Sequence, residues 1–135
     1  MTRGLSATQR TLRALRQQGL VCAIAEKWNQ FAGPHGIRQD LFGWIDVVVL
    51  DPQRGIIGVQ STTGSQFAGH LRKMLDSECT ENLIEWLRCG GKAELWAWRK
   101  VKVKRGGKAL VWRPRVQEIT LEMIEKGPEK YVRSS

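Results

Sequence analysis

Asp46 and Gln60 are the two polar residues whose spacing most clearly permits shared chemistry. Asp46 interrupts the apolar segment 44–50, and Gln60 lies in the next apolar segment, 56–62. With a turn centred on Gln53, antiparallel pairing places Asp46 opposite Gln60 on one side of a sheet, with Cβ atoms about 4.5–5.5 Å apart. A carboxylate that is buried there is costly unless it is paired or binds a metal. We therefore expect these two side chains to form the centre of a polar site.

The chemistry that this pair favours is coordination of a hard divalent cation. Mg²⁺ takes oxygen ligands and keeps several waters, and Asp46, Gln60 and the carbonyl group of Ser61 all offer oxygens. Such a cation, Mg²⁺ or Mn²⁺, would polarise a phosphodiester and lower the pKa of an attacking water. The alternative is that Asp46 only begins a strand and accepts hydrogen bonds from backbone N–H groups.

The elements that must position this pair follow from the apolar periodicity and the turn residues. A helix is predicted over 6–18, begun by a capping box of Ser6 and Gln9. The order then expected is a strand over 21–28 that is buried as far as Glu26, a loop over 29–41, the strands 44–50 and 56–62, a helix capped by Ser65, a helix capped by Thr80, a strand over 93–104 and its return over 110–112. For 116–124 both a strand and a short helix remain open, and a mobile tail is expected over about 127–135.

Basic residues gather on the last predicted hairpin. A two-residue turn at Gly106-Gly107 pairs Val103 with Leu110 and Val101 with Trp112, with the valines toward the core. The other side is a basic ribbon suited to a phosphate backbone, made of Lys100, Lys102, Lys104, Arg105 and Arg113, helped by Arg99 and Arg115. The alternative is that its lysines only protect a sheet edge from aggregation. Trp96 and Trp98 are expected to pack or to contact a dimer partner.

Composition narrows the class of protein. The chain has 135 residues, 41% of them hydrophobic, which suits a single domain over 1–135. A net charge of +9 favours a polyanionic partner such as nucleic acid. No apolar run is long enough for a membrane span, no secretory signal is expected at the start, and no glycine-rich nucleotide-binding motif occurs. The three cysteines lack metal-site spacing and are expected to be reduced thiols in the cytoplasm.

The segment 38–50, RQDLFGWIDVVVL, followed by 58–62, GVQST, resembles the core of the PD-(D/E)XK nuclease superfamily. It is most similar to small phage and archaeal Holliday junction resolvase-like enzymes. The order of elements is similar over roughly 5–100, and the specific motif is confined to 38–62. The resemblance implies a restriction-endonuclease-like α/β fold, with a central mixed β-sheet flanked by helices. It also implies a Mg²⁺- or Mn²⁺-dependent DNA endonuclease, with branched or junction DNA as a candidate substrate, that works as a homodimer in a bacterium, an archaeon or a phage-infected host.

The resemblance also assigns roles to residues of the motif. Asp46 takes the position of the metal-binding aspartate, and Gln60 takes the Glu/Gln position. Thr62 occupies the lysine position, which is a departure, because threonine cannot carry the positive charge that helps the attacking water. Lys73 on the following helix is the expected replacement, and Lys27 is the second.

An accessory acid and DNA contacts complete the expected site. Glu26 is the first choice for the acid and Asp40 the second, while Glu26 paired with Lys27 as a surface charge is the alternative. Arg38 is expected to contact DNA together with the basic ribbon, and His70 to face either the site or solvent. Because of Thr62, a DNA-binding module that does not cut remains open, as does a structural or assembly protein that uses its tryptophans.

Overall fold

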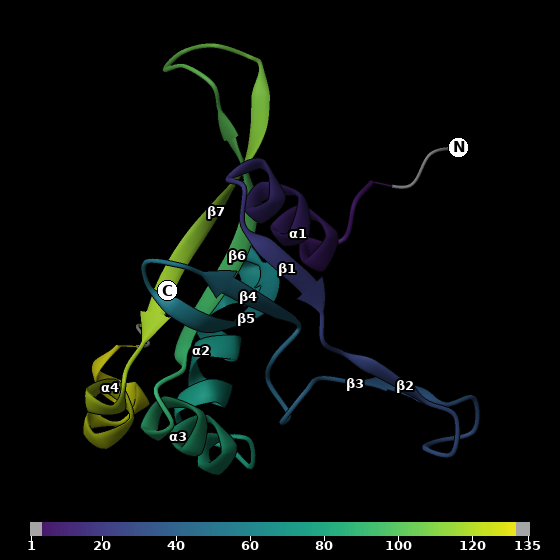
Figure 1. The fold of residues 1–135 in the computed structure, drawn as a ribbon. Coiled ribbons are helices and arrows are strands. Elements are labelled where there is room, and N and C mark those ends of the chain that lie inside the picture. Colours follow the sequence, from purple (N-terminus) through teal and green to yellow (C-terminus); the bar gives the residue numbers. More distant parts are fainter. Residues whose placement is uncertain (1–3, 132–135) are drawn as a thin grey trace.

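Helices cover both faces of a central β-sheet in the computed structural model of the chain, which describes residues 4–131 (Figure 1). The sheet has five strands in the order β1-β4-β5-β6-β7, and a separate two-stranded sheet pairs β2 with β3. The helices are α1 (Ala7–Gln17), α2 (Phe67–Leu75), α3 (Thr80–Arg88) and α4 (Leu121–Lys126), with short 3-10 helices η1 (Gly64–Gln66) and η2 (Pro128–Lys130). The strands are β1 (Val21–Ile24), β2 (Lys27–Asn29), β3 (Ile37–Gln39), β4 (Val47–Asp51), β5 (Gly55–Thr63), β6 (Lys92–Lys102) and β7 (Leu110–Ile119).

The path of the chain explains why this sheet is mixed. Strands β1, β4 and β5 are antiparallel neighbours, β6 lies parallel to β5, and β7 returns antiparallel to β6. A parallel neighbour needs a long crossover, and α2 and α3 supply it between β5 and β6. The expected α/β architecture of a mixed sheet flanked by helices is therefore confirmed.

Helix α1 covers one face of the sheet. Its predicted capping box is present: the Gln9 N–H donates to Ser6 Oγ at 3.2 Å, and the Ser6 N–H donates to Gln9 Oε1 at 3.0 Å. Leu12 and Leu15 are buried on its apolar side. They belong to a core cluster with strand residues of β1, β4, β5 and β6, namely Cys22, Val47, Val49, Ile57, Val59, Trp96 and Trp98.

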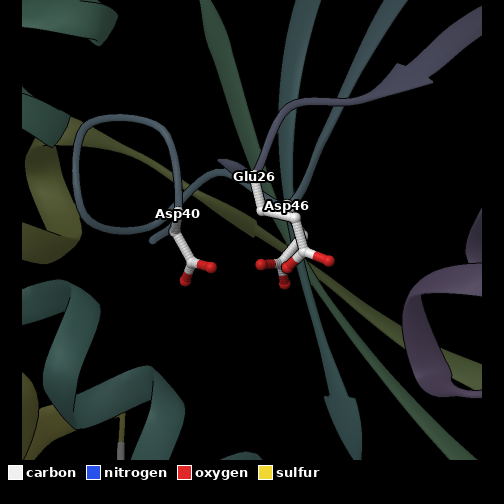
Figure 2. A group of neighbouring side chains, drawn as sticks. All are labelled: Glu26, Asp40 and Asp46. Atoms are coloured by element: carbon white, nitrogen blue, oxygen red, sulfur yellow. The ribbon is translucent and has the colours of Figure 1, made fainter. Parts of the chain in front are cut away.

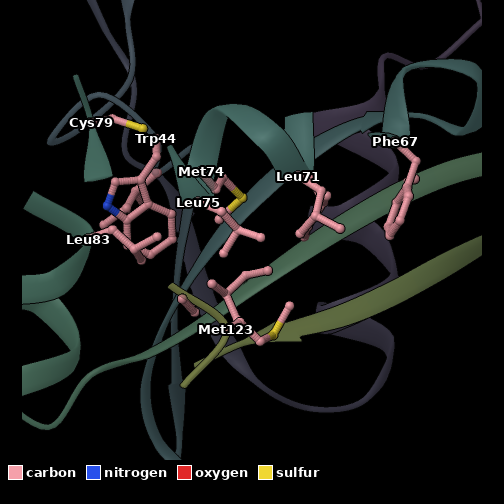
Figure 3. Close-up of a cluster of buried hydrophobic side chains, with 13 residues drawn as sticks. Trp44, Phe67, Leu71, Met74, Leu75, Cys79, Leu83 and Met123 are labelled. Atoms are coloured by element: carbon pink, nitrogen blue, oxygen red, sulfur yellow. The ribbon is translucent and has the colours of Figure 1, made fainter. Parts of the chain in front are cut away.

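Helices α2, α3 and α4 cover the opposite face, where the larger core cluster lies (Figure 3). Met74 and Leu83 are fully buried there, together with Trp44, which precedes β4. Glycine at position 58 makes room for this tryptophan, because a Cβ on Gly58 would lie 2.6 Å from the Trp44 ring. The strand β5 is thus held by side chains on both of its faces.

The segment after α1 differs from the prediction of one buried strand over 21–28. Strand β1 ends at Ile24, and within it only Cys22 is buried. The reason is its place at the edge of the sheet, where Val21 pairs with Leu50, which is also exposed. Strand β2 follows, and it pairs with β3 inside the segment that was expected to be a loop, forming an arm that projects from the domain (Figure 1).

The predicted register of the last hairpin is wrong by one residue. Val101 pairs with Val111 and Lys100 with Trp112, because the connection is longer than a two-residue turn. The Val103 N–H donates to the Ala109 carbonyl, and a tighter turn forms inside this pair, between Lys104 and Gly107. Val103 is 56% exposed, so the expected burial of the valine side also fails.

Several element ends differ from prediction as well. Segment 116–124 contains both of the elements that remained open, the end of β7 and the start of α4. Ser65 and Thr80 do not cap helices: Ser65 lies inside η1, and the Thr80 hydroxyl binds the backbone of Ser77 and Met74. Within the predicted mobile tail, η2 is a 3-10 helix with Pro128 buried, and 132–135 lie outside the described residues.

Candidate functional site

The predicted Asp46–Gln60 pair is present. The register of β4 and β5 pairs Leu50 with Ile56 and Val48 with Gly58, as expected, and the Gln60 amide Nε2 lies 3.4 Å from Asp46 Oδ2. The backbone N–H of Ser61 donates to the same carboxylate oxygen at 2.8 Å. Both side chains are buried, at 5% exposure for Asp46 and 3% for Gln60.

Two further carboxylates converge on Asp46 (Figure 2). Glu26 lies in the link between β1 and β2, and Asp40 follows β3, so the β2–β3 arm carries an acid at each end of its path. Ligand oxygens of Glu26, Asp40 and Asp46 all lie within 4.8 Å of one another. The Gln60 Nε2 donates to Asp40 Oδ2 at 3.2 Å and so ties Asp40 to the sheet. Both candidates for the accessory acid therefore reach the cluster.

Crowding of these acids changes the proton affinity of Asp46. Burial raises the pKa of its carboxyl, and the side chain of Asp40 raises it further, to about 8. The charge of Glu26 acts in the same direction, while the hydrogen bond from the Ser61 N–H opposes the rise. Without a cation, Asp46 is thus held largely protonated at neutral pH.

Gln60 contributes an oxygen without a partner. Its Oε1 is buried and has no hydrogen-bond partner within the described residues, while its Nε2 is held by the two aspartates. A buried polar atom left in this way is uncommon and needs an explanation. The three carboxylates form a set of oxygen ligands, the kind that hard divalent cations take. Gln60 turns its amide nitrogen to two of them, and turning the amide over would place its oxygen there instead.

A pocket with basic walls opens beside the acids. Lys27, Arg38 and Lys73 line it together with Asp40 and the loop Leu41–Gly43. The structure therefore brings both candidate replacements for the motif lysine, Lys73 and Lys27, to one pocket. Arg38 forms an ion pair with Glu26 at 3.2 Å, so the partner of Glu26 lies across the arm and is not Lys27, which was the alternative.

Thr62, at the lysine position of the motif, is buried and contacts side chains that follow it in the chain. Its hydroxyl lies 3.4 Å from Gln66 Oε1 and 3.3 Å from His70 Nδ1. The same His70 nitrogen is 3.1 Å from the Gln66 carbonyl oxygen. His70 thus belongs to a contact with β5, and position 62 itself carries a hydroxyl in place of the ammonium group of the motif.

The sequence did not reveal a hydroxyl network behind the cluster. Thr11 is fully buried, and its Oγ1 lies 3.0 Å from the Ala7 carbonyl, 2.9 Å from Trp98 Nε1 and 2.8 Å from Ser61 Oγ. Because a carbonyl only accepts and an indole N–H only donates, Thr11 donates to Ala7 and Ser61 donates to Thr11. The network fixes the residue whose backbone N–H holds Asp46. The one signal for it was a threonine beside the apolar positions of α1.

The basic ribbon projects from the sheet as the end of the β6–β7 hairpin (Figure 1). Its cations are exposed, and among residues 4–131 none of them forms an ion pair with a carboxylate. Those predicted to contact DNA here are Lys100, Lys102, Lys104, Arg105 and Arg113. Trp96 and Trp98 are packed against α1, as expected for core residues.

Comparisons of the chain with models of protein families, with curated proteins and with solved structures gave no match. Among the residues that the structure describes, no helix has the length and apolar character needed to cross a membrane. The interpretation of the site therefore depends on its own geometry and charge.

Proposed function

We propose that this protein is a Mg²⁺- or Mn²⁺-dependent endonuclease that hydrolyses phosphodiester bonds of DNA, with a restriction-endonuclease-like fold. The observation that carries the proposal is the convergence of Glu26, Asp40 and Asp46 beside Gln60, whose buried Oε1 has no partner among the described residues. The fold assignment is supported by the order of elements: an aspartate at one strand and a glutamine on the next, followed by a helix.

The ligand set follows from the donors that meet at the cluster. Asp46 and Gln60 would hold the cation, with Asp40 or Glu26 and the Ser61 carbonyl adding oxygens. When bound, the cation would supply charge stabilisation and a lowered pKa for a bound water. At neutral pH such a positive charge would favour ionised Asp46, because its buried carboxyl, with a pKa of about 8, otherwise keeps its proton.

The chain's own cations would act on the substrate. Lys73 extends from α2 into the pocket that Asp40 lines, and Lys27 enters the same pocket from β2. An ammonium group there would attract the scissile phosphate and orient the attacking water. We favour Lys73, because only the short helix η1 separates α2 from β5, so α2 carries it beside the motif strand.

DNA would be held mainly through its phosphates. The net charge of +9, the exposed β6–β7 ribbon and Arg38 at the pocket rim favour backbone contacts over reading of base edges. A homodimer is proposed on the logic that two strands of a junction are cut symmetrically. The β2–β3 arm offers apolar surface for such a contact, since Phe31 is 87% and Trp28 58% exposed.

The test is incubation of the purified protein with supercoiled plasmid, linear duplex and a synthetic four-way junction, in Mg²⁺ or Mn²⁺ and in EDTA. We expect cuts in the metal-containing reactions alone, with the junction as the preferred substrate. Salt-sensitive binding of DNA without any cutting would contradict nuclease activity.

The second candidate function, a DNA-binding module that does not cut, is favoured by Thr62. Its buried hydroxyl replaces the cation that the motif normally carries. If the protein binds DNA without cutting it, the acidic cluster would only shape the pocket beside the bound DNA backbone. Failure to bind DNA at about 0.1 M salt would exclude both candidates and favour a structural or assembly role.

A further inference from the structure

A second basic pocket lies at the end of β5, where η1 begins. This end of the strand lies beyond the residues of the acidic cluster. It is lined by Thr63 and Ser65 from the turn and by Arg99, Lys100 and Arg115 from β6 and β7, with Trp112 at its side. The lining includes three cations and no acidic residue. Among residues 4–131 these cations make no ion pair, so their charge is available to a ligand.

The pocket exists because the two parallel strands end at different places. The last pair of the β5–β6 ladder joins Thr63 to Trp98, and β6 then continues to Lys102 without β5 beside it. The 3-10 helix η1 turns into this space. Gly64 permits the close approach, because a Cβ there would lie 3.1 Å from the Arg99 Cβ.

Aromatic rings hold the surrounding cations in place. The Arg115 guanidinium lies 3.7 Å from the centre of the Phe67 ring, at the start of α2. Trp112 has the Arg10 guanidinium at 3.9 Å and the Lys100 ammonium at 5.4 Å from its ring centre. Arginines that stack on rings keep their N–H groups free to bind oxygens. Basic charge therefore continues from this pocket onto α1.

The polar groups of the pocket are matched to a phosphate. Guanidinium and ammonium groups donate and carry positive charge. Thr63 and Ser65 share a hydrogen bond between their hydroxyls at 3.2 Å, which leaves one hydroxyl proton to donate to a ligand. No acid lies in the first turn of η1 or of α2, so no side-chain carboxylate of these turns repels an anion. An uncharged or cationic ligand would leave this set of donors unmatched.

We infer that this pocket binds a second phosphodiester of the nucleic-acid backbone, apart from the one at the acidic cluster. The inference rests on the proposed action on DNA and adds a substrate contact to it. Thr63 lies three residues beyond Gln60 on β5, which is about 10 Å along a strand, so this pocket is separate from the acidic cluster. The pocket would fix the direction in which the strand leaves the reacting phosphate.

The experiment measures binding of a fluorescently labelled DNA duplex at several salt concentrations, with Ca²⁺ in place of Mg²⁺. The variants are Arg99→Ala, which removes a cation from the pocket, and Ser65→Asp, which adds a carboxylate. The Ser65→Asp change lies beside the start of α2, where an acid stabilises a helix, so weaker binding by it would not arise from unfolding. Lys92→Ala is the matched control for Arg99→Ala, because Lys92 is an exposed cation at the other end of β6.

We expect Arg99→Ala to weaken binding about 5- to 10-fold at 0.1 M salt and to reduce the salt slope by about 0.9, as for one lost phosphate contact. Ser65→Ala is the control for Ser65→Asp. Relative to that control, Ser65→Asp should weaken binding at least as much as Arg99→Ala weakens it relative to wild type. Lys92→Ala should bind like wild type. This result supports the pocket even if the wild-type protein never cuts DNA.

If Arg99→Ala and Ser65→Asp bind DNA as tightly as Lys92→Ala does, the inference is overturned, even if the wild-type protein cuts DNA normally. Failure of the wild-type protein to bind the duplex at about 0.1 M salt would overturn it as well. Cutting by wild type in Mg²⁺ is scored separately, so the pocket and the nuclease proposal can fail independently.

Discussion

Asp46 is the residue whose energetics the site depends on most. Its carboxylate is buried beside two other acids, and burial is the largest cause of its raised pKa. Ionising such a group costs free energy, and a bound cation would offset that cost. The hydrogen bond from the Ser61 N–H, at 2.8 Å, keeps one oxygen in place whichever protonation state is present.

The raised pKa predicts how stability changes with pH in EDTA. Between about pH 4 and pH 8 the folded protein keeps the Asp46 proton, whereas the unfolded chain, with a pKa near 3.8, has lost it. Because the unfolded state then binds fewer protons, this group's contribution to the free energy of unfolding falls as pH rises. Asp46→Asn removes that dependence, so thermal melting should show wild type losing stability relative to the variant from pH 5 to pH 8. Parallel melting curves would contradict this.

The two lysines of the pocket should differ in how much each contributes to the rate of cleavage. Lys73→Met keeps the length of the side chain and removes its charge, and we expect it to lower kcat at least about 100-fold with little change in metal affinity. Lys27→Met is the matched control and should have a smaller effect. Single-turnover cleavage at saturating Mg²⁺ makes the comparison, and a larger loss with Lys27→Met would reverse the assignment.

At this scale the sequence was informative where contacts are local. Asp46 and Gln60 could be paired by counting from one short turn, and the structure has that register. The meeting of Glu26 with Asp40 depends on the path of the β2–β3 arm, which no apolar periodicity marked. The Thr11, Ser61 and Trp98 hydroxyl network joins three separate elements, so spacing alone could not show it.

Strand β5 carries the site and also separates the two halves of the core. Its Gly58 faces Trp44, which is fully buried just before the site strand β4. A Cβ at position 58 would meet the tryptophan ring at 2.6 Å and Ile45 at 3.1 Å. The place where β4 begins, and with it the position of Asp46, therefore depends on this glycine.

Matched glycine substitutions test this packing. Gly58→Ala forces the Trp44 ring to move and should lower the free energy of unfolding by about 1–3 kcal/mol. Gly69→Ala is the same change in α2, and the Cβ that it adds would have no heavy atom within 4 Å. It should raise stability by about 0.5–1 kcal/mol through the helix propensity of alanine. Urea denaturation measures both, and equal effects would show that Trp44 is not held against Gly58.

The two hairpins of the sheet show when register can be predicted. The β4–β5 turn is short and is held by Asp51, whose Oδ1 accepts the Gln53 N–H at 2.9 Å. The β6–β7 connection lets Val103 pair with Ala109 across a longer loop. Its strands are solvated on both faces at that end, so burial does not select the register.

At the scale of the whole molecule, both the charge and the shape favour contact with a polyanion. Two hairpins project from the domain, the β2–β3 arm beside the acidic cluster and the basic β6–β7 ribbon (Figure 1). With a net charge of +9, the surface attracts a polyanion. A nucleic-acid backbone between these projections would contact the ribbon, the second basic pocket and the basic walls beside Asp40.

Binding of DNA should accordingly depend steeply on salt and little on sequence. If 6–10 phosphates are contacted, affinity should fall by about 10³–10⁵ between 50 and 200 mM salt. Fluorescence anisotropy with two duplexes of unrelated sequence measures both properties. A flat salt dependence, or strong preference for one duplex, would argue against recognition through the backbone.

The most direct test of the account is metal-dependent cleavage of a labelled junction by wild type, Asp46→Asn and Asp51→Asn. Asp46→Asn keeps the shape of the side chain and removes the charge that would hold the cation. Asp51→Asn makes the same change in the β4–β5 turn, where the aspartate binds Arg54 instead. We predict that wild type and Asp51→Asn cut in Mg²⁺ and that Asp46→Asn does not, while still binding the junction. Cleavage by Asp46→Asn at the wild-type rate would contradict the proposed site.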